Sequence, residues 1–216
     1  MSGFCPFLKP SLERGLLKFT HIRIQSPEDP ERIFEAVLFW AGLFCAEMMR
    51  VRRMTYPDAA DRILYSETVV IDLDERIAID GAQVFGWPHW MLKKAYAHKG
   101  IVFGKFWKGE EDRTQDGTLI TPPESHFLSI RSAVKSRDGR FFNKAPDLQQ
   151  LMLSSDDDGS ELVLPKTSSK SLKSQLEKFR ERGDCQFFQD VLEELVLSGL
   201  YFELKQRAVL EYNAEQ

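Results

Sequence analysis

A cysteine near the start of the chain stands in an unusual local setting. Cys5 is followed by Pro6 and lies between Phe4 and Phe7. A thiolate can act as a nucleophile, a redox centre or an axial haem ligand, and a lowered pKa favours each role. The nearby Lys9 and Arg14 would favour the thiolate. The alternative is that these side chains only fasten the N-terminal segment to the core, because a free cysteine is commonly a small buried hydrophobe.

Histidine is the next residue type that can carry chemistry, and the chain has four: His21, His89, His98 and His126. His89 and His98 are nine residues apart, so on one continuous helix they point to opposite faces and cannot form the paired ligands of a zinc helix. We therefore predict no metal site. His89 and His98 remain candidates for a proton donor or a second cofactor ligand, although lone histidines are more often structural or exposed.

Arg131 lies between Ile130 and Ser132 on a predicted strand, where a guanidinium is costly to bury without a partner. It is a candidate to bind a substrate carboxylate or a haem propionate. Equally, it can pair with Asp72 or Glu67 on a neighbouring strand, or face water. His126 is five residues away on the same strand, so the two side chains should point to opposite sides of the sheet.

Aromatic residues concentrate around the second predicted helix and third predicted strand: Trp87, Trp90, Phe106 and Trp107. Such a group can line a pocket for a flat apolar ligand, and we take Trp87, Trp90 and Trp107 as candidate binding residues. Packing within the core is the commoner explanation for aromatic side chains at this density.

The composition is that of an ordinary globular protein, with 216 residues, 43% hydrophobic residues and a formal net charge of −4. That charge argues against a general nucleic-acid binder, which needs a basic surface. The longest uncharged run, 36–46, is too short to span a bilayer, and residues 1–5 lack the basic start of a signal peptide. The three cysteines are scattered and imply no disulfide framework, so we expect a cytoplasmic protein.

The elements that must position these residues follow from periodicity. Alternation over 16–24 predicts a strand. A proline and acidic residues then begin a helix near Ser26, which runs to the basic residues at 50–53. The β-branched density of 62–73 predicts a second strand. A second helical region follows within 74–99, with its firm part beginning near Pro88.

Gly100 is well placed to end that second helix. Two more strands are predicted at 101–107 and 126–134, separated by a long polar loop at 108–124. A short helix is predicted over 141–152. The order β-α-β-α-β-β indicates an α/β (α+β) fold with a mixed sheet, in which the first strands are parallel and the last two antiparallel. Thioredoxin-like domains share this element order, but their Cys-x-x-Cys signature is absent here.

The C-terminal part differs in composition. Residues 154–171 are rich in Ser, Asp and Lys and predict a linker. Two amphipathic helices are expected at 172–182 and 186–210. We therefore divide the chain into an α/β domain at 1–153, a linker at 154–171 and a helical extension at 172–216. The apolar stripe of residues 172–210 must be covered, either by its own domain or by a partner or second copy of the chain.

Three short segments together resemble a known group of proteins: Gly3-Phe4-Cys5-Pro6-Phe7, Gly100 to Phe106, and Phe127 to Arg131. They are similar to a bacterial domain family of unknown function that carries a Cys-Pro-Phe signature and is often encoded near biosynthetic genes. The resemblance covers about residues 3–153. A more distant similarity is to haem-dependent N-oxygenase-like proteins, although Trp107 stands where these proteins have a histidine.

The residues and the resemblance together favour a small-molecule or cofactor-binding protein, with haem as the candidate cofactor. The resemblance extends this to an oxidative enzyme of specialised metabolism that uses Cys5. The alternative hypothesis is a non-enzymatic interaction or assembly protein that acts through its C-terminal helices. The sequence does not name a substrate.

Overall fold

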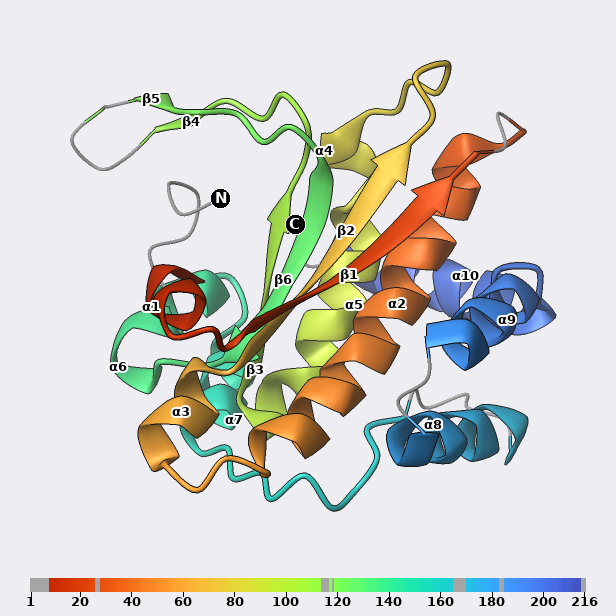
Figure 1. The fold of residues 1–216 in the computed structure, drawn as a ribbon. Helices are drawn as coiled ribbons and strands as arrows, with labels where there is room; N and C mark the ends of the chain where they lie inside the picture. Colours follow the sequence, from red (N-terminus) through yellow and green to blue (C-terminus); the bar gives the residue numbers. More distant parts are fainter. Residues whose placement is uncertain are drawn as a thin grey trace.

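A computed structural model describes residues 8–25, 28–113, 117, 119–164, 170–182 and 185–214. Its centre is a four-stranded mixed sheet in the order β1-β2-β6-β3, built from Leu17–Ile24, Ser66–Leu73, His126–Ser132 and Ile101–Phe106 (Figure 1). β1 pairs with β2 in parallel, whereas β6 pairs antiparallel with both β2 and β3. The mixed α/β sheet predicted from the sequence is confirmed.

The long helix α2 (Pro30–Arg53) supplies much of the core and lies against one face of the sheet together with α5 (Gly86–Tyr96). Every residue of α2 from Phe34 to Arg50 is buried. Gly42 allows its close approach, because a Cβ there would meet the side chains of Leu92 on α5 and Leu128 on β6. The four-stranded sheet therefore has a continuous apolar layer on this face.

The C-terminal helices form a further layer on the outside of α2 and α5. α8 (Lys170–Arg182) and α9 (Cys185–Val196) pack on α2, whereas α10 (Gly199–Ala214) packs on α5. Their buried apolar residues belong to the same hydrophobic cluster as the sheet and α2. The apolar stripe is thus largely covered by the chain itself, through helices rather than directly by the sheet.

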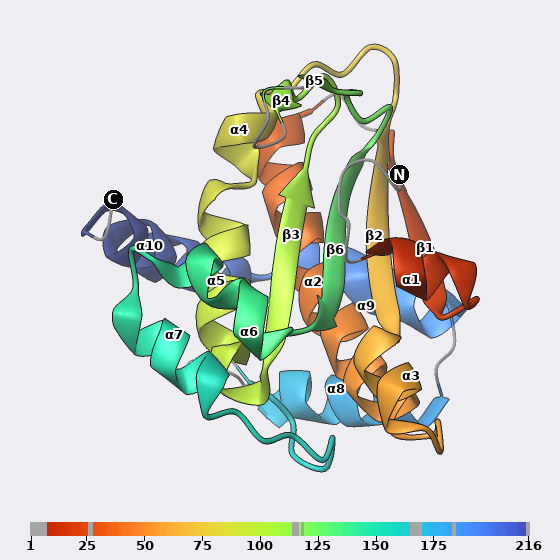
Figure 2. The same cartoon turned by 90° about the vertical axis from the view of Figure 1, so that its left-hand side faces the viewer.

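The opposite face of the sheet is covered differently. The short helices α1 (Leu8–Glu13) and α6 (Lys135–Asp138) lie on this side, near the lower end of the strands in Figure 2. Between α6 and α7 (Pro146–Leu153) a 3-10 turn, η2 (Gly139–Phe142), passes around the edge strand β3. We call this the outer face; it carries the odd-numbered residues of β1, such as Phe19 and His21.

Several element boundaries differ from those predicted. Residues 62–64, assigned to a strand, end the helix α3 (Ala59–Leu64), whose first turn is capped by the carboxylate of Asp58. The predicted helix at 186–210 is instead two helices, because the helical conformation is interrupted at 197–198. The region 74–99 holds α4 (Gly81–Val84), α5 and a closing 3-10 turn, η1 (Ala97–Lys99), and Gly100 ends it at a φ of 62° as expected.

The polar loop at 108–124 contains a small two-stranded sheet of β4 (Asp112–Arg113) and β5 (Leu119–Ile120). The short helix predicted over 141–152 is α7, which begins at Pro146. The predicted helix start at Ser26 lies outside the described residues. In its place, Asp29 precedes α2 in the left-handed conformation, with a φ of 47°.

Candidate functional site

The residues predicted to carry chemistry are not gathered around one cavity in the described part of the chain. Cys5 lies outside the described residues, so its role stays a prediction. His89, on α5, is partly buried, and its Nε2 lies 2.9 Å from the carbonyl oxygen of Phe103. Burial lowers the pKa of His89 to about 3, and the nearby cation of Lys93 adds to this effect. A neutral His89 donates this hydrogen bond and ties α5 to β3.

The tryptophans are mainly packing residues. Trp87 lies between Phe39 of α2 and Tyr201 of α10, with ring centroids 5.7 and 5.9 Å away. Trp107 packs beside Phe85 and over Gly81, where an added Cβ would meet its ring. The indole nitrogens of Trp87 and Trp90 are buried and have no hydrogen-bond partner among the described residues.

Arg131 is buried and already paired. Its Nη1 and Nη2 donate to the two carboxylate oxygens of Asp138 on α6, at 2.7 and 2.9 Å. Neither Asp72 nor Glu67 is its partner; Asp138, only seven residues along the chain, supplies the carboxylate. Because Ile130 faces the core, Arg131 lies on the outer face, and the sheet separates it from Trp87. His126 points to the α2 side, against Phe34, so the two side chains lie on opposite sides of the sheet as predicted.

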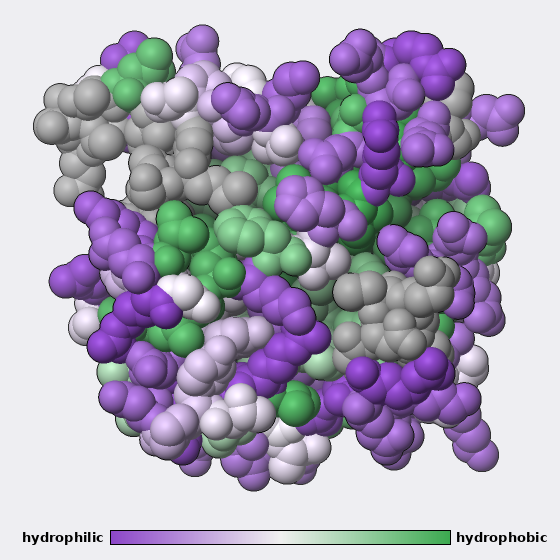
Figure 3. Space-filling view, in the orientation of Figure 1, coloured by the Kyte–Doolittle hydropathy of each residue, from purple (hydrophilic) through white to green (hydrophobic). Residues whose placement is uncertain are grey.

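A large hollow lies along β1, the edge strand at the opposite end of the sheet from β3. We call it the β1–α9 groove. Its volume is about 700 Å³, within the range of natural ligand sites. Every residue from Lys18 to Gln25 lines it, so the space follows the strand along its length. In the space-filling view, hydrophobic side chains reach the surface between β1 and α9 (Figure 3).

The wall of the groove opposite β1 is one face of α9. Phe188, Leu192 and Val196, spaced four residues apart, line it, and Phe179 of α8 extends the wall. Residues of α2, including Val37 and Met48, also line it. The periodic apolar residues of α9 were recognised in the sequence, but only the folded chain shows that they face β1.

The free side of β1 carries unpaired backbone groups. The amides of Ser66 and Asp74 donate to the carbonyl oxygens of Leu16 and Ile24, so the even-numbered residues of β1 point their backbone groups toward β2. The amides and carbonyls of Phe19, His21 and Arg23 therefore point away from the sheet. No hydrogen bond to these groups is present among the described residues. An exposed row of this kind is a template for pairing with another strand.

The charges along the groove are unequal. Lys18 and Arg23 are exposed and form no ion pair within the described chain, whereas the one exposed acid on the lining is Glu193. His21 lies beside Asp72, with its Nδ1 3.4 Å from a carboxylate oxygen. The open part of the groove therefore favours an acidic ligand.

One end of the groove holds a buried polar group. Glu67 accepts hydrogen bonds from Arg52 at 2.8 Å and from the hydroxyl of Tyr65 at 3.1 Å. Burial raises the pKa of Glu67, against the opposing charge of Arg52. The Cys45 thiol, hydrogen-bonded to Thr20, also lines the groove, and burial raises its pKa well above the ordinary value. Cys45 is therefore a thiol at neutral pH and not a nucleophile.

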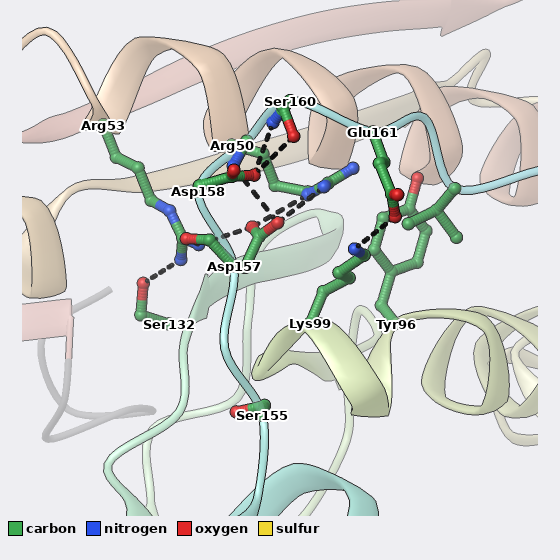
Figure 4. Close-up of polar contacts among 12 residues, drawn as sticks. Arg50, Arg53, Tyr96, Lys99, Ser132, Ser155, Asp157, Asp158, Ser160 and Glu161 are labelled. Atoms are coloured by element: carbon green, nitrogen blue, oxygen red, sulfur yellow. Dashed lines mark hydrogen bonds and ion pairs between the residues drawn. The ribbon is translucent and has the colours of Figure 1, made fainter.

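A second cluster of buried charges lies beneath α2, where the predicted linker crosses it (Figure 4). Asp157 accepts hydrogen bonds from both Arg50 and Arg53. Arg50 also pairs with Glu47 at 2.8 and 3.0 Å, and the hydroxyl of Tyr96 donates to the same carboxylate. The cluster is internally neutralised and closed to solvent, so it fastens residues 154–164 onto α2 rather than forming an active site.

No group of three or more His, Cys, Asp or Glu side chains suited to a metal ion is found among the described residues. Likewise, no helix in that part of the chain has the length and apolar character needed to cross a membrane. Comparisons with protein-family models, curated proteins and solved structures find no match to this chain. The resemblance to a Cys-Pro-Phe family therefore stays a prediction, and function must be inferred from the molecule itself.

Proposed function

We propose that this protein binds an extended acidic segment of another polypeptide, which adds as a strand to the free edge of β1. The observation that carries the proposal is that the β1–α9 groove follows the unpaired edge of β1 and has the apolar face of α9 as its opposite wall. Addition of a strand between a sheet edge and a helix is a recurring mode of peptide recognition. In this mode the backbone supplies hydrogen bonds and alternate side chains supply specificity.

The geometry gives the bound segment a defined pattern. β1 is eight residues long, which corresponds to about 26 Å of strand. Side chains of the added strand alternate between two environments. One set faces Ile22 and the apolar α9 wall, and the other lies beside His21 and Arg23. The expected ligand therefore alternates apolar and acidic residues.

The test begins with randomised ten-residue peptides displayed on phage and selected on the immobilised full-length protein. The best peptide is then synthesised, and its affinity is measured by fluorescence anisotropy. Selected peptides should show the apolar–acidic alternation. If no peptide is enriched, or if the enriched peptides lack the pattern, the proposal is wrong.

Two variants at one position separate backbone pairing from other effects. His21→Pro removes an outward amide without breaking a hydrogen bond to β2, and proline is tolerated on the open side of edge strands. His21→Ala removes the side chain and keeps the amide. We expect the proline variant to bind at least tenfold more weakly than the alanine variant. Equal affinities of the two folded variants contradict strand addition.

A charge reversal provides a second test that does not touch the backbone. Arg23 is exposed, so Arg23→Glu should leave the fold intact while weakening the binding of acidic peptides. The matched control is Arg137→Glu, which changes an exposed arginine on α6, away from the groove. An unchanged affinity of the Arg23 variant for acidic peptides would contradict the proposed preference for an acidic ligand.

A cofactor-binding function that uses Cys5 stays a prediction. Neither the β1–α9 groove nor the other cavity of the described chain, near His98, brings a histidine together with Trp87, Trp90, Trp107 or Arg131, so neither is the expected haem site. The absorption spectrum of the protein after incubation with haemin tests this hypothesis, with Cys5→Ser as the comparison. A Soret band that shifts in the variant supports thiolate ligation, and a featureless spectrum in both rejects it.

A further inference from the structure

A second cavity lies away from the β1–α9 groove, between α5, α7, α10 and the segment 162–164. Its volume is about 580 Å³, again within the range of small-molecule sites. Four separate parts of the chain contribute to it, so it exists only in the folded protein. We call it the α5–α10 cavity. It includes His98, a candidate residue from the sequence that the groove does not use.

The lining of this cavity is mainly aliphatic. Leu148 and Leu151 come from α7, and Leu151 is 44% exposed at the surface. The remaining apolar lining residues come from the other three segments: Met91, Ala95, Leu162, Val163, Leu164 and Leu204. A hydrocarbon body placed here would remove apolar surface of both partners from water, which is favourable in proportion to the area covered.

The polar groups of the cavity are predominantly basic. Lys94, His98 and Arg207 line it, against a single acid, Glu211. Lys94 and Glu211 form an ion pair at 2.5 Å. Arg207 is exposed and has no ion pair or hydrogen bond with any described side chain. One guanidinium is therefore available to an anion, and its planar pair of donors matches a carboxylate.

We propose that the α5–α10 cavity binds a small amphipathic carboxylate, whose hydrocarbon body contacts the aliphatic lining and whose carboxylate pairs with Arg207. The site is independent of strand addition at β1. A neutral apolar ligand would form no ion pair with Arg207. The charge of a cationic ligand would be repelled by Lys94 and Arg207, which line the same cavity. Charge complementarity therefore selects an anionic head group.

The test compares three probes of equal chain length, decanoate, decanol and decyltrimethylammonium, by isothermal titration calorimetry with the full-length protein. The two ionic probes are kept below their micelle concentrations, and decanol is kept below its solubility limit. Decanoate should bind with a stoichiometry of one. Decanol should bind at least tenfold more weakly, and the ammonium compound should not bind. Equal affinities for decanoate and decanol, or no binding of decanoate, overturn the proposal.

Two variants assign the binding to this cavity. Arg207→Gln should weaken decanoate at least tenfold and leave decanol unchanged, whereas the control Arg137→Gln, at an exposed position on α6, should alter neither. Ala95→Phe fills the cavity without changing its charges, so it should reduce binding of both compounds. If Arg207→Gln and Arg137→Gln bind decanoate equally well, the assigned site is wrong.

Discussion

Asp157 accepts hydrogen bonds from Arg50 at 2.6 and 2.9 Å, although 107 residues separate the two in sequence. Burial alone would raise the pKa of Asp157, but Arg50 and Arg53 lower it below its ordinary value. Asp157→Asn should therefore leave Arg53 without a carboxylate partner and Arg50 with Glu47 alone. We expect a loss of about 3–5 kcal/mol in the free energy of unfolding, measured by urea denaturation.

The neighbouring residue supplies the control for this variant. Asp158 is exposed and, among the described residues, forms hydrogen bonds only with Ser160 in its own turn. Asp158→Asn removes the same charge from the same segment and should change stability by less than about 0.5 kcal/mol. Similar losses for the two variants would show that net charge, rather than the buried pairing, determines the effect.

His89 should make the protein sensitive to acid. Burial depresses its pKa to about 3 in the folded protein, whereas an unfolded histidine titrates near pH 6.5. Between these values the unfolded state binds the additional proton. The stability contributed by neutral His89 is thus present above about pH 6.5 and is lost progressively as the pH falls, at up to about 1.4 kcal/mol per pH unit.

His89→Gln keeps a side-chain donor for the carbonyl oxygen of Phe103 and does not titrate. The free energy of unfolding of this variant, measured between pH 7 and 4, should fall less steeply than that of the wild type. If the free energy of unfolding of the His89 variant fell with pH as steeply as that of the wild type, burial of a neutral imidazole at His89 would be contradicted.

Removal of the C-terminal helices should expose the core. Phe44 of α2 packs against Phe179 and Phe188, with ring centroids 5.1 and 5.8 Å away. A chain that ends after Ser154 loses these contacts and also Asp157. We expect it to aggregate or to lose its near-ultraviolet circular dichroism. A soluble, folded fragment with a changed oligomeric state in size-exclusion chromatography would instead identify the helices as an assembly element.

The sequence predicts the sheet well because its signals are local. Alternation along 16–24 and the β-branched run around Val69 identify strands that the structure contains. Two helix boundaries were missed for opposite reasons. Ile63 and Leu64 resemble strand residues, although the cap at Asp58 was a signal for α3. The apolar period continues across 197–198, so nothing in the hydrophobic pattern indicates the break between α9 and α10.

The cavities and the buried pairs were far harder to predict, because they depend on contacts between distant segments. The groove exists only because α9 lies opposite β1, which is more than 160 residues earlier in the chain. Asp157 stands among other acids in a segment whose composition resembles a linker. Only its position between Arg50 and Arg53 distinguishes it from Asp158.

The long separation between Arg50 and Asp157 has a consequence for biosynthesis. Translation at about 5–20 residues per second needs roughly 5–20 s to add the intervening 107 residues. During that interval α2 holds Arg53 without its carboxylate partner and Arg50 with Glu47 alone. The buried pairing of Arg53, and the second pairing of Arg50, can therefore form only after Asp157 has been made, so the order of synthesis places this contact late in folding.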